Sequence, residues 1–116
     1  MIAKFLAILL LPFSASSANA QSLEIDCTGT NAWPTAMAHT KIMNNNGLNS
    51  DDFIYEKTKV ERIASEKMLG DLYKQVHKVT FFLKNGKKFE VITVNTASGR
   101  ECSMSDVAVF VIKTEY

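Results

Sequence analysis

The sequence predicts a small α+β domain in which one helix near the amino terminus packs on a four-stranded antiparallel sheet. Three observations support this fold class. The segment between Pro34 and Gly47 begins and ends as helices do. Asn85-Gly86 stands between two β-rich runs, which is typical of a hairpin. A run of six apolar residues, Val107 to Ile112, follows as the last strand.

Residues 1–20 are expected to be a cleaved secretory signal peptide. Lys4 gives a positive start, residues 5–13 are apolar, and Ala18-Asn19-Ala20 is a small-x-small site before Gln21. The apolar run is too short to span a bilayer, so we expect no membrane insertion. Residues 21–116 are then a single small domain of an exported protein.

The first element of this domain is a helix over about residues 32–45. Asn31 can cap it, Pro34 falls in its first turn, and Gly47 provides the left-handed residue after its end. Helical spacing groups seven residues on one apolar face, which we expect to lie on the sheet. They are Ala32, Trp33, Ala36, Met37, His39, Thr40 and Met43.

Polar turn residues at 44–52 separate the helix from a first strand, expected over residues 53–64. Apolar residues between 57 and 76 also fit helical spacing, so a helix over 57–76 is the alternative. Gly70-Asp71 argues for a break inside that segment.

The hairpin comprises strands at 72–83 and 87–94 around Lys84-Asn85-Gly86. A two-residue loop would place Phe81 opposite Glu90, whereas a three-residue loop with Gly86 in the left-handed conformation places it opposite Phe89. The second register pairs apolar with apolar residues across the strands, so we choose it.

The last strand, Val107 to Ile112, follows a polar loop at 95–105. Its apolar residues are continuous, and four of them are β-branched. Such a run is typical of a strand covered on both faces, so we expect it inside the sheet and not at its edge.

Charge and size exclude some classes of function. Without Lys4, the thirteen Lys and Arg residues become twelve, equal to the twelve Asp and Glu residues. A neutral chain cannot neutralise many phosphates, so we expect no nucleic-acid partner.

Cys27 and Cys102 are the two cysteines of the chain. Exported proteins fold in oxidising compartments, so we expect one disulfide between them, near the helix start and before the last strand. The chain has no Asn-x-Ser/Thr glycosylation site. This fits a periplasmic protein somewhat better than a secreted, extracellular one.

The order of one helix and four strands, with an early and a late cysteine, resembles the cystatin-like arrangement. It also resembles, more loosely, small periplasmic immunity proteins such as the colicin M immunity proteins. The resemblance covers element order and cysteine placement and carries over no functional residue.

His39 and His77 are the histidines of the chain, and two imidazoles can catalyse acid–base cleavage of a phosphodiester. The alternative is that both pack in the core from opposite layers. No clustered spacing of His, Cys or carboxylates predicts a metal site, and we expect no cofactor.

Small hydroxyl and charged side chains gather in the loop before the last strand. Held by Cys102, they can form a rigid recognition loop, or they can be a solvated turn that satisfies its own backbone. The candidate binding residues are Ser98, Arg100, Glu101, Ser103, Ser105 and Asp106.

The chosen register leaves one sheet face without a helix. That face carries Val76, Phe82, Ile92 and Val94 among lysines and Glu90, a mixture often found at interfaces. We therefore expect a non-enzymatic, inhibitor- or immunity-like protein that recognises another protein. The alternatives are a small nuclease or hydrolase that uses His39 and His77, and an accessory of the secretion machinery or envelope that self-associates, for example as a homodimer, through its sheet.

Overall fold

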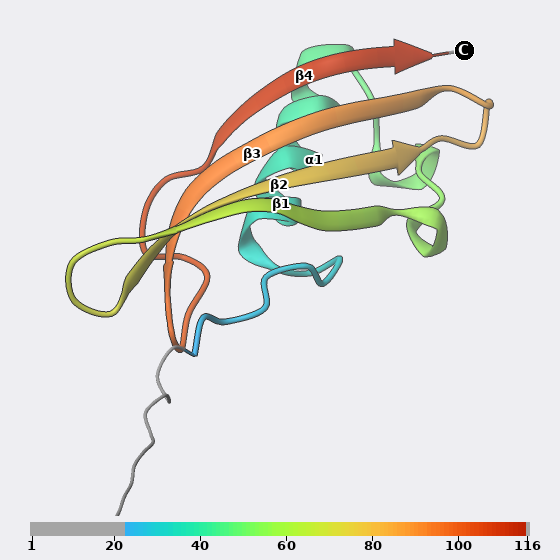
Figure 1. Ribbon diagram of the computed structural model, residues 1–116. Coiled ribbons are helices and arrows are strands. Elements are labelled where there is room, and N and C mark those ends of the chain that lie inside the picture. The colour runs from blue at the N-terminus through green and yellow to red at the C-terminus, as the bar shows by residue number, and fades with distance from the viewer. Residues whose placement is uncertain (1–22, 116) are drawn as a thin grey trace, which may run out of the picture.

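The computed structural model describes residues 23–115, so the expected signal peptide at residues 1–20 lies outside the described part. One helix, α1 (Trp33–Asn46), lies behind a sheet of four strands (Figure 1). The strands are β1 (Lys59–Lys67), β2 (Leu72–Phe82), β3 (Lys88–Ser98) and β4 (Ala108–Glu115). Within residues 23–115, no helix is long and apolar enough to cross a membrane.

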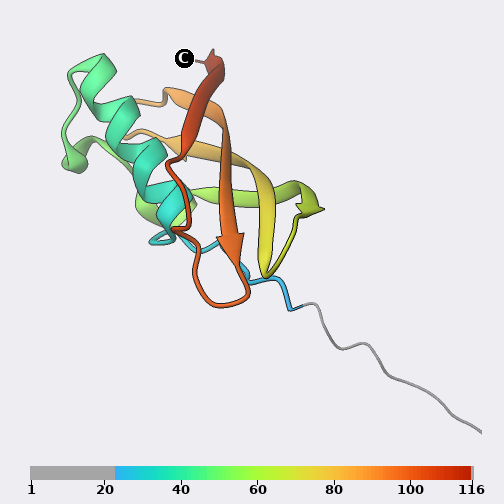
Figure 2. The same cartoon turned by 90° about the vertical axis from the view of Figure 1, so that its left-hand side faces the viewer.

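The sheet is an antiparallel meander with the strand order β1-β2-β3-β4. Seen from the side, α1 covers one face and leaves the other bare (Figure 2). The α+β fold class is therefore confirmed. The expectation that the last strand is internal is wrong, because each strand pairs with its neighbour along the chain and β4 is left at the edge.

Helix α1 begins and ends close to the expected residues. Pro34 lies in the first turn, where its missing N–H removes no helical hydrogen bond. Gly47 adopts a φ of 62°, and its N–H donates to the carbonyl of Met43. The expected cap is wrong: Ala32 occupies the N-cap position, and no side chain caps the helix.

The helix buries a different face from the one that its spacing suggested. Pro34, Ala38 and Ile42 follow one another at intervals of four residues, and they are buried together with Thr35. Trp33 is instead 37% exposed at the margin, where its Nε1 donates to the carbonyl of Ser105. On this buried face, Thr35 and Ala38 have small side chains, and Ala38 and Ile42 belong to the core cluster.

The polar segment after the helix forms two 3₁₀ turns, Ser50–Asp52 and Tyr55–Lys57, before β1 begins. Between the turns, Phe53 makes an isolated bridge with Leu83. A strand is thus present as expected, but it covers 59–67 instead of 53–64. The alternative helix over 57–76 is wrong, since Gly70 turns the chain with a φ of 71° between β1 and β2.

The hairpin of β2 and β3 has the three-residue register. Phe81 lies opposite Phe89, and Val79 lies opposite Val91. Gly86 has a φ of 93°, a conformation that residues with a Cβ rarely adopt. Pairing apolar with apolar residues therefore identified the register correctly.

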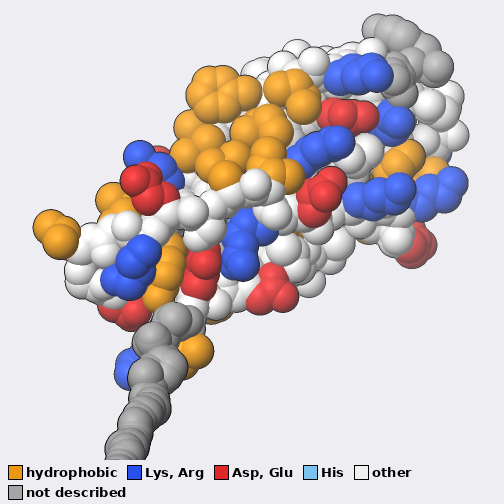
Figure 3. Space-filling view, viewed as in Figure 1, with side chains coloured by type: hydrophobic (Ala, Val, Ile, Leu, Met, Phe, Trp, Pro, Cys, Tyr) orange, Lys and Arg blue, Asp and Glu red, His pale blue; other side chains and the backbone are white. Residues whose placement is uncertain are grey.

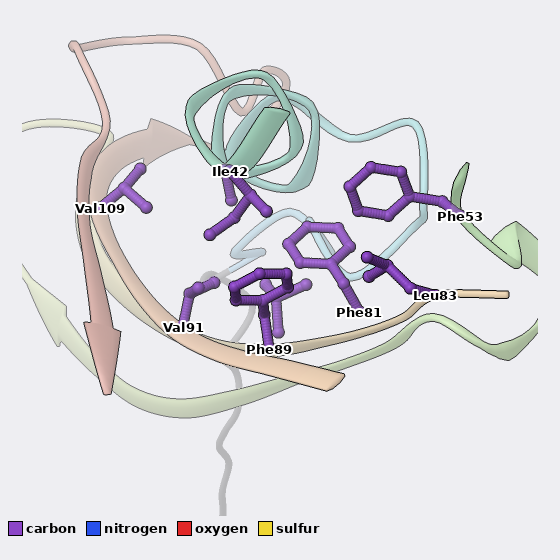
Figure 4. Packing of buried hydrophobic residues seen from close by; sticks show 9 residues of the cluster. Ile42, Phe53, Phe81, Leu83, Phe89, Val91 and Val109 are labelled. Atoms are coloured by element: carbon purple, nitrogen blue, oxygen red, sulfur yellow. The ribbon is translucent and has the colours of Figure 1, made fainter. Parts of the chain in front are cut away.

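The core lies between α1 and the inner face of the sheet, which we define as the face toward the helix (Figure 4). Phe81 and Phe89 stand on the sheet below Ile42, and Phe53 and Val109 close the two sides. All five are at least nine-tenths buried. The complete cluster is Ala38, Ile42, Phe53, Val79, Phe81, Leu83, Phe89, Val91 and Val109.

The expected disulfide is confirmed. Cys27 and Cys102 are bonded, with their Cα atoms 5.9 Å apart. The bond joins the segment before α1 to the loop before β4, across a sequence separation of 75 residues. Closing a loop of that length stabilises a fold by about 4 kcal/mol through the entropy of the unfolded chain.

Candidate functional site

The proposed recognition loop connects β3 to β4 and uses part of its polar groups to hold its own shape. Ser98 Oγ accepts hydrogen bonds from the N–H groups of Arg100 and Glu101. Ser105 Oγ accepts from the N–H of Thr96 and donates to the carbonyl of Asp106. The two serine hydroxyls therefore satisfy backbone groups of the loop itself.

Other side chains of this loop face solvent. Arg100, Glu101, Ser103 and Asp106 are exposed, and Met104 is 46% exposed. The N–H of Met104 donates to the carbonyl of Thr96 at the end of β3. The loop is thus tied to one end of the sheet, and its charged groups remain available for contact.

The outer face of the sheet, opposite to α1, carries a continuous apolar area. Pairing across the strands places Ala64 beside Val76, Val76 beside Val94, and Ile92 beside Phe110. Figure 3 looks onto this face and shows hydrophobic side chains gathered over it. We call this area the outer patch; it consists of Ala64, Val76, Ile92, Val94, Ala108 and Phe110.

Lysines dominate the outer face on one side of this patch. Lys78 and Lys88 both lie close to Glu90, with N–O distances of 3.7 and 3.9 Å. Lys59 and Lys88 also stand over the ring of Phe82, each 5.9 Å from its centroid. Lys59, Lys78 and Lys88 outnumber Glu90 and Glu61, which lies opposite Lys78, so this flank of the patch has a small excess of positive charge.

The edge strand β4 adds exposed apolar surface to the outer patch. Phe110 is 57% exposed on the outer face and Ile112 is 53% exposed, whereas Val111, which lies opposite the core residue Val91, is 47% exposed on the helix side of the sheet. Lys41 of the helix donates to the carbonyl of Val109 at 3.5 Å, so it covers one backbone group near this edge. An apolar edge strand is a surface on which another chain can pair or pack.

On the other side of the sheet, His39 lies in a pocket of about 430 Å³ between α1 and the second 3₁₀ turn. His39 Nε2 and the hydroxyl of Tyr55 are hydrogen-bonded at 2.8 Å. The imidazole also packs edge-on against Phe53, with ring centroids 4.4 Å apart. The pocket is lined by Thr30, Asn31, Thr35, Ala36, His39, Thr40, Tyr55, Thr58 and Phe81.

His77 does not line this pocket. It is fully buried on the inner face of β2, directly opposite Thr93 of β3. Gln75 and Asn95 form the next inward pair along the same strands. A catalytic pair of histidines needs a shared opening to substrate, and the arrangement of His39 and His77 does not provide one.

These inward pairs form a buried polar layer beside the apolar core. The amide of Gln75 donates to Glu24 and to the carbonyl of Ile25, and that of Asn95 donates to the carbonyl of Cys102. Other buried polar atoms of residues 23–115 have no hydrogen-bond partner within the chain. They are Thr35 Oγ1, Gln75 Oε1, His77 Nδ1 and Nε2, Thr93 Oγ1 and Asn95 Oδ1.

Burial disfavours the charged form of both histidines. It lowers the pKa of His39 below the usual value. It also lowers the pKa of His77, and the nearby Arg62 guanidinium lowers it further, against smaller opposing effects of Asp26 and Glu24. Both pKa shifts have the direction expected for packed side chains, because burial makes the charged form of an imidazole less favourable.

Sequence reasoning missed the partner of His39 and the position of Phe110. Tyr55 lies sixteen residues after His39, in a 3₁₀ turn that no spacing pattern in the sequence predicted. Phe110 was expected to be covered because its strand was placed inside the sheet. Neither error could be detected from local sequence, since both depend on how distant segments pack.

Within residues 23–115, no group of three or more His, Cys, Asp or Glu side chains is placed to hold a metal ion. A scan against protein-family models, a search of curated proteins and a search of solved structures each found no match to this chain.

Proposed function

We propose that this protein is a small exported binding protein, without enzymatic activity, that recognises another protein through the outer face of its sheet. The observation that carries the proposal is the outer patch, to which β4 contributes Ala108 and the exposed ring of Phe110. Apolar surface of this kind, bordered by charged groups, is typical of interfaces. The disulfide supports export, since such bonds form in oxidising compartments such as the periplasm.

The charges beside the patch define the chemistry of the partner. Lys59, Lys78 and Lys88 lie on one flank, with Glu90 between the last two. A complementary surface would have apolar residues at its centre and acidic residues on the matching side. The loop at 98–106 lies at the other end of the sheet, where Arg100 and Glu101 would contact the rim of the same partner.

Two variants of the oxidised mature protein test the proposal. Phe110→Ser removes the aromatic ring of the patch, and Lys78→Glu reverses a charge on its flank. In a pull-down from envelope extract, we expect the wild type to retain a specific protein. Phe110→Ser should lose it, and Lys78→Glu should release it at lower salt, because rim charges act through screened attraction.

Leu69→Ser is the matched control. Leu69 is 92% exposed in the turn between β1 and β2, so this change removes an apolar side chain that lies away from the patch. Equal retention by wild type and Leu69→Ser, with loss in Phe110→Ser, supports the proposal. Equal retention by all three variants contradicts it.

Sedimentation velocity separates this function from self-association through the sheet. A hetero-binding protein is expected to remain monomeric over the concentration range used for the pull-down. A dimer that Phe110→Ser dissociates would instead favour an accessory of the secretion machinery or envelope that self-associates through its sheet.

Mass spectrometry of the exported product tests whether the signal peptide is cleaved before Gln21.

A further inference from the structure

We propose that the partner of this protein contributes an extended segment that pairs with the edge strand β4 and becomes a fifth strand of the sheet. The segment would carry apolar side chains on both faces and an acidic side chain on the helix side. This inference rests on the proposed function, and it specifies the kind of partner surface that meets the outer patch.

The two edge strands of the sheet differ in how they are protected. In β1, five of the nine residues are charged. Glu24 of the amino-terminal segment also forms an ion pair with Arg62 and accepts a hydrogen bond from Ser65 of this strand. In β4, residues 108–112 include no charged residue. Charged side chains and covering segments keep other chains from pairing with an edge, so β4 is the edge that suits a further strand.

Exposed apolar side chains lie on both faces of β4. The ring of Phe110 is 57% exposed on the outer face, and Val111 is 47% exposed on the helix side. A helix or loop seated on the outer patch would cover the first and leave the second in water. A strand added beside β4 directs its alternate side chains to both faces, so it covers both.

The position of the added strand follows from the register of β4. Pairing with β3 is regular over residues 108–111, and Ile112 is then an additional residue before Lys113 pairs with Glu90. A bulge of this kind bends the strand and interrupts its edge. The partner segment would therefore face residues 107–111.

The helix side of this edge supplies a positive charge. Lys41 is exposed on α1, and its amine donates to the carbonyl of Val109 in β4 at 3.5 Å. Within residues 23–115, no carboxylate forms an ion pair with Lys41. An ammonium group has three hydrogens to donate, so it can keep this bond and also bind a carboxylate. An acidic side chain on the helix side of the added strand would meet this charge.

The probe is the acetylated and amidated peptide Thr-Glu-Val-Val-Val-Glu-Thr, which places both glutamates and one valine on the same face of a strand. It is titrated into the isotope-labelled, oxidised mature protein, and amide NMR spectra are recorded. We expect it to shift the amides of residues 107–113 and of Lys41. Methylation of every amide nitrogen of the peptide should abolish these shifts, because strand pairing needs main-chain N–H donors.

The contribution of Lys41 is measured with a second peptide that has glutamine in place of both glutamates. The glutamine peptide should bind the wild type about threefold more weakly, the effect of one exposed ion pair. Lys41→Gln should weaken binding of the acidic peptide to the same extent and leave the glutamine peptide unaffected. Lys84→Gln, in the hairpin loop between β2 and β3, is the matched control and should bind both peptides as the wild type does.

A second pair of variants locates the edge. Val111→Glu places a negative charge on the helix side of β4 and should weaken binding of the acidic peptide about tenfold, because like charges on neighbouring strands repel. Ile63→Glu is the matched control, since Ile63 is 51% exposed on the opposite edge strand, β1. Its affinity for the peptide should equal that of the wild type.

Four results with the peptides would overturn the proposal: no shifts, shifts centred on β1, equal binding of the methylated or glutamine peptide, or equal weakening by Val111→Glu and Ile63→Glu. A wild type that dimerises in sedimentation velocity, and that Val111→Glu makes monomeric, would also overturn it, because the added strand would then come from a second copy of this chain.

The pull-down with Phe110→Ser tests the proposed function separately. Loss of the retained protein in Phe110→Ser, without any peptide shifts, would support the outer patch as an interface and reject strand addition. Peptide shifts without any protein retained by the wild type would contradict the proposed function and support β4 as an edge that binds strands.

Discussion

His77 and Thr93 face each other across β2 and β3, both fully buried, and neither side chain has a hydrogen-bond partner within the chain. Burial therefore disfavours the charged form of this imidazole, which would be poorly solvated there. Arg62, paired with His77 from β1, adds a positive charge nearby, and the carboxylates of Asp26 and Glu24 act in the opposite direction.

This arrangement predicts that acid destabilises the protein. The folded pKa of His77 lies below the usual value of 6.5, so below that pH the unfolded chain binds more protons than the folded one. The free energy of unfolding should therefore fall as the pH drops from 8 to 5, by at most about 1.4 kcal/mol per pH unit for each such histidine. Urea denaturation at several pH values measures this dependence of the free energy of unfolding on pH.

His77→Gln keeps a polar side chain at this position and removes its titration, so it should flatten the dependence on pH. His39 contributes in the same direction, since burial lowers its pKa too. The double variant with His39→Gln should be flatter than either single variant. A wild type equally stable at pH 8 and pH 5 would contradict the buried neutral state of His77.

Reduction of Cys27–Cys102 should cost a large part of the stability. The bond closes a loop with a sequence separation of 75 residues, for which chain entropy predicts about 4 kcal/mol. Small domains have about 5–15 kcal/mol in total. Urea denaturation of the same protein with and without reductant measures the loss. An unchanged midpoint, with both thiols shown free by mass spectrometry, would rule out this role.

Phe81 and Phe89 form the central cross-strand pair of the core. Truncation of either to alanine should lower the free energy of unfolding by about 3–5 kcal/mol, because each leaves a cavity. Phe110→Ala, on the exposed edge strand, should change it by about 0.5 kcal/mol or less. A double variant of the core pair should cost less than the sum of the single changes, since neighbours share one cavity. Equal effects at 81, 89 and 110 would be inconsistent with the edge position of β4.

The two ends of α1 should respond differently to alanine. Asn31 makes no capping contact, so Asn31→Ala should leave stability within about 0.5 kcal/mol of the wild type. Gly47 has a φ of 62°, so Gly47→Ala should cost about 1 kcal/mol through backbone strain. Thermal denaturation, monitored by circular dichroism, compares the stabilities of the two variants. A loss of about 1 kcal/mol for Asn31→Ala would indicate a cap after all.

Local residues of the sequence were sufficient to predict several elements. Pro34 and Gly47 marked the limits of the helix, because each acts on the backbone conformation of its own turn. Asn85-Gly86 and the apolar residues beside it determined the hairpin and its register. The two cysteines allowed a single intramolecular pairing, which the fold contains. These features depend on a few neighbouring residues or on a simple count.

Only the tertiary structure decided which surfaces are buried. Ile42 and not Trp33 lies in the core, because the helix packs on the sheet along the line of Pro34, Ala38 and Ile42. Strand β4 lies at the edge although its sequence suits an interior strand, since strand order depends on competition among distant pairings. The contact of His39 with Tyr55 and the exposed ring of Phe110 follow from that long-range packing, so the candidate sites could not be predicted from local sequence.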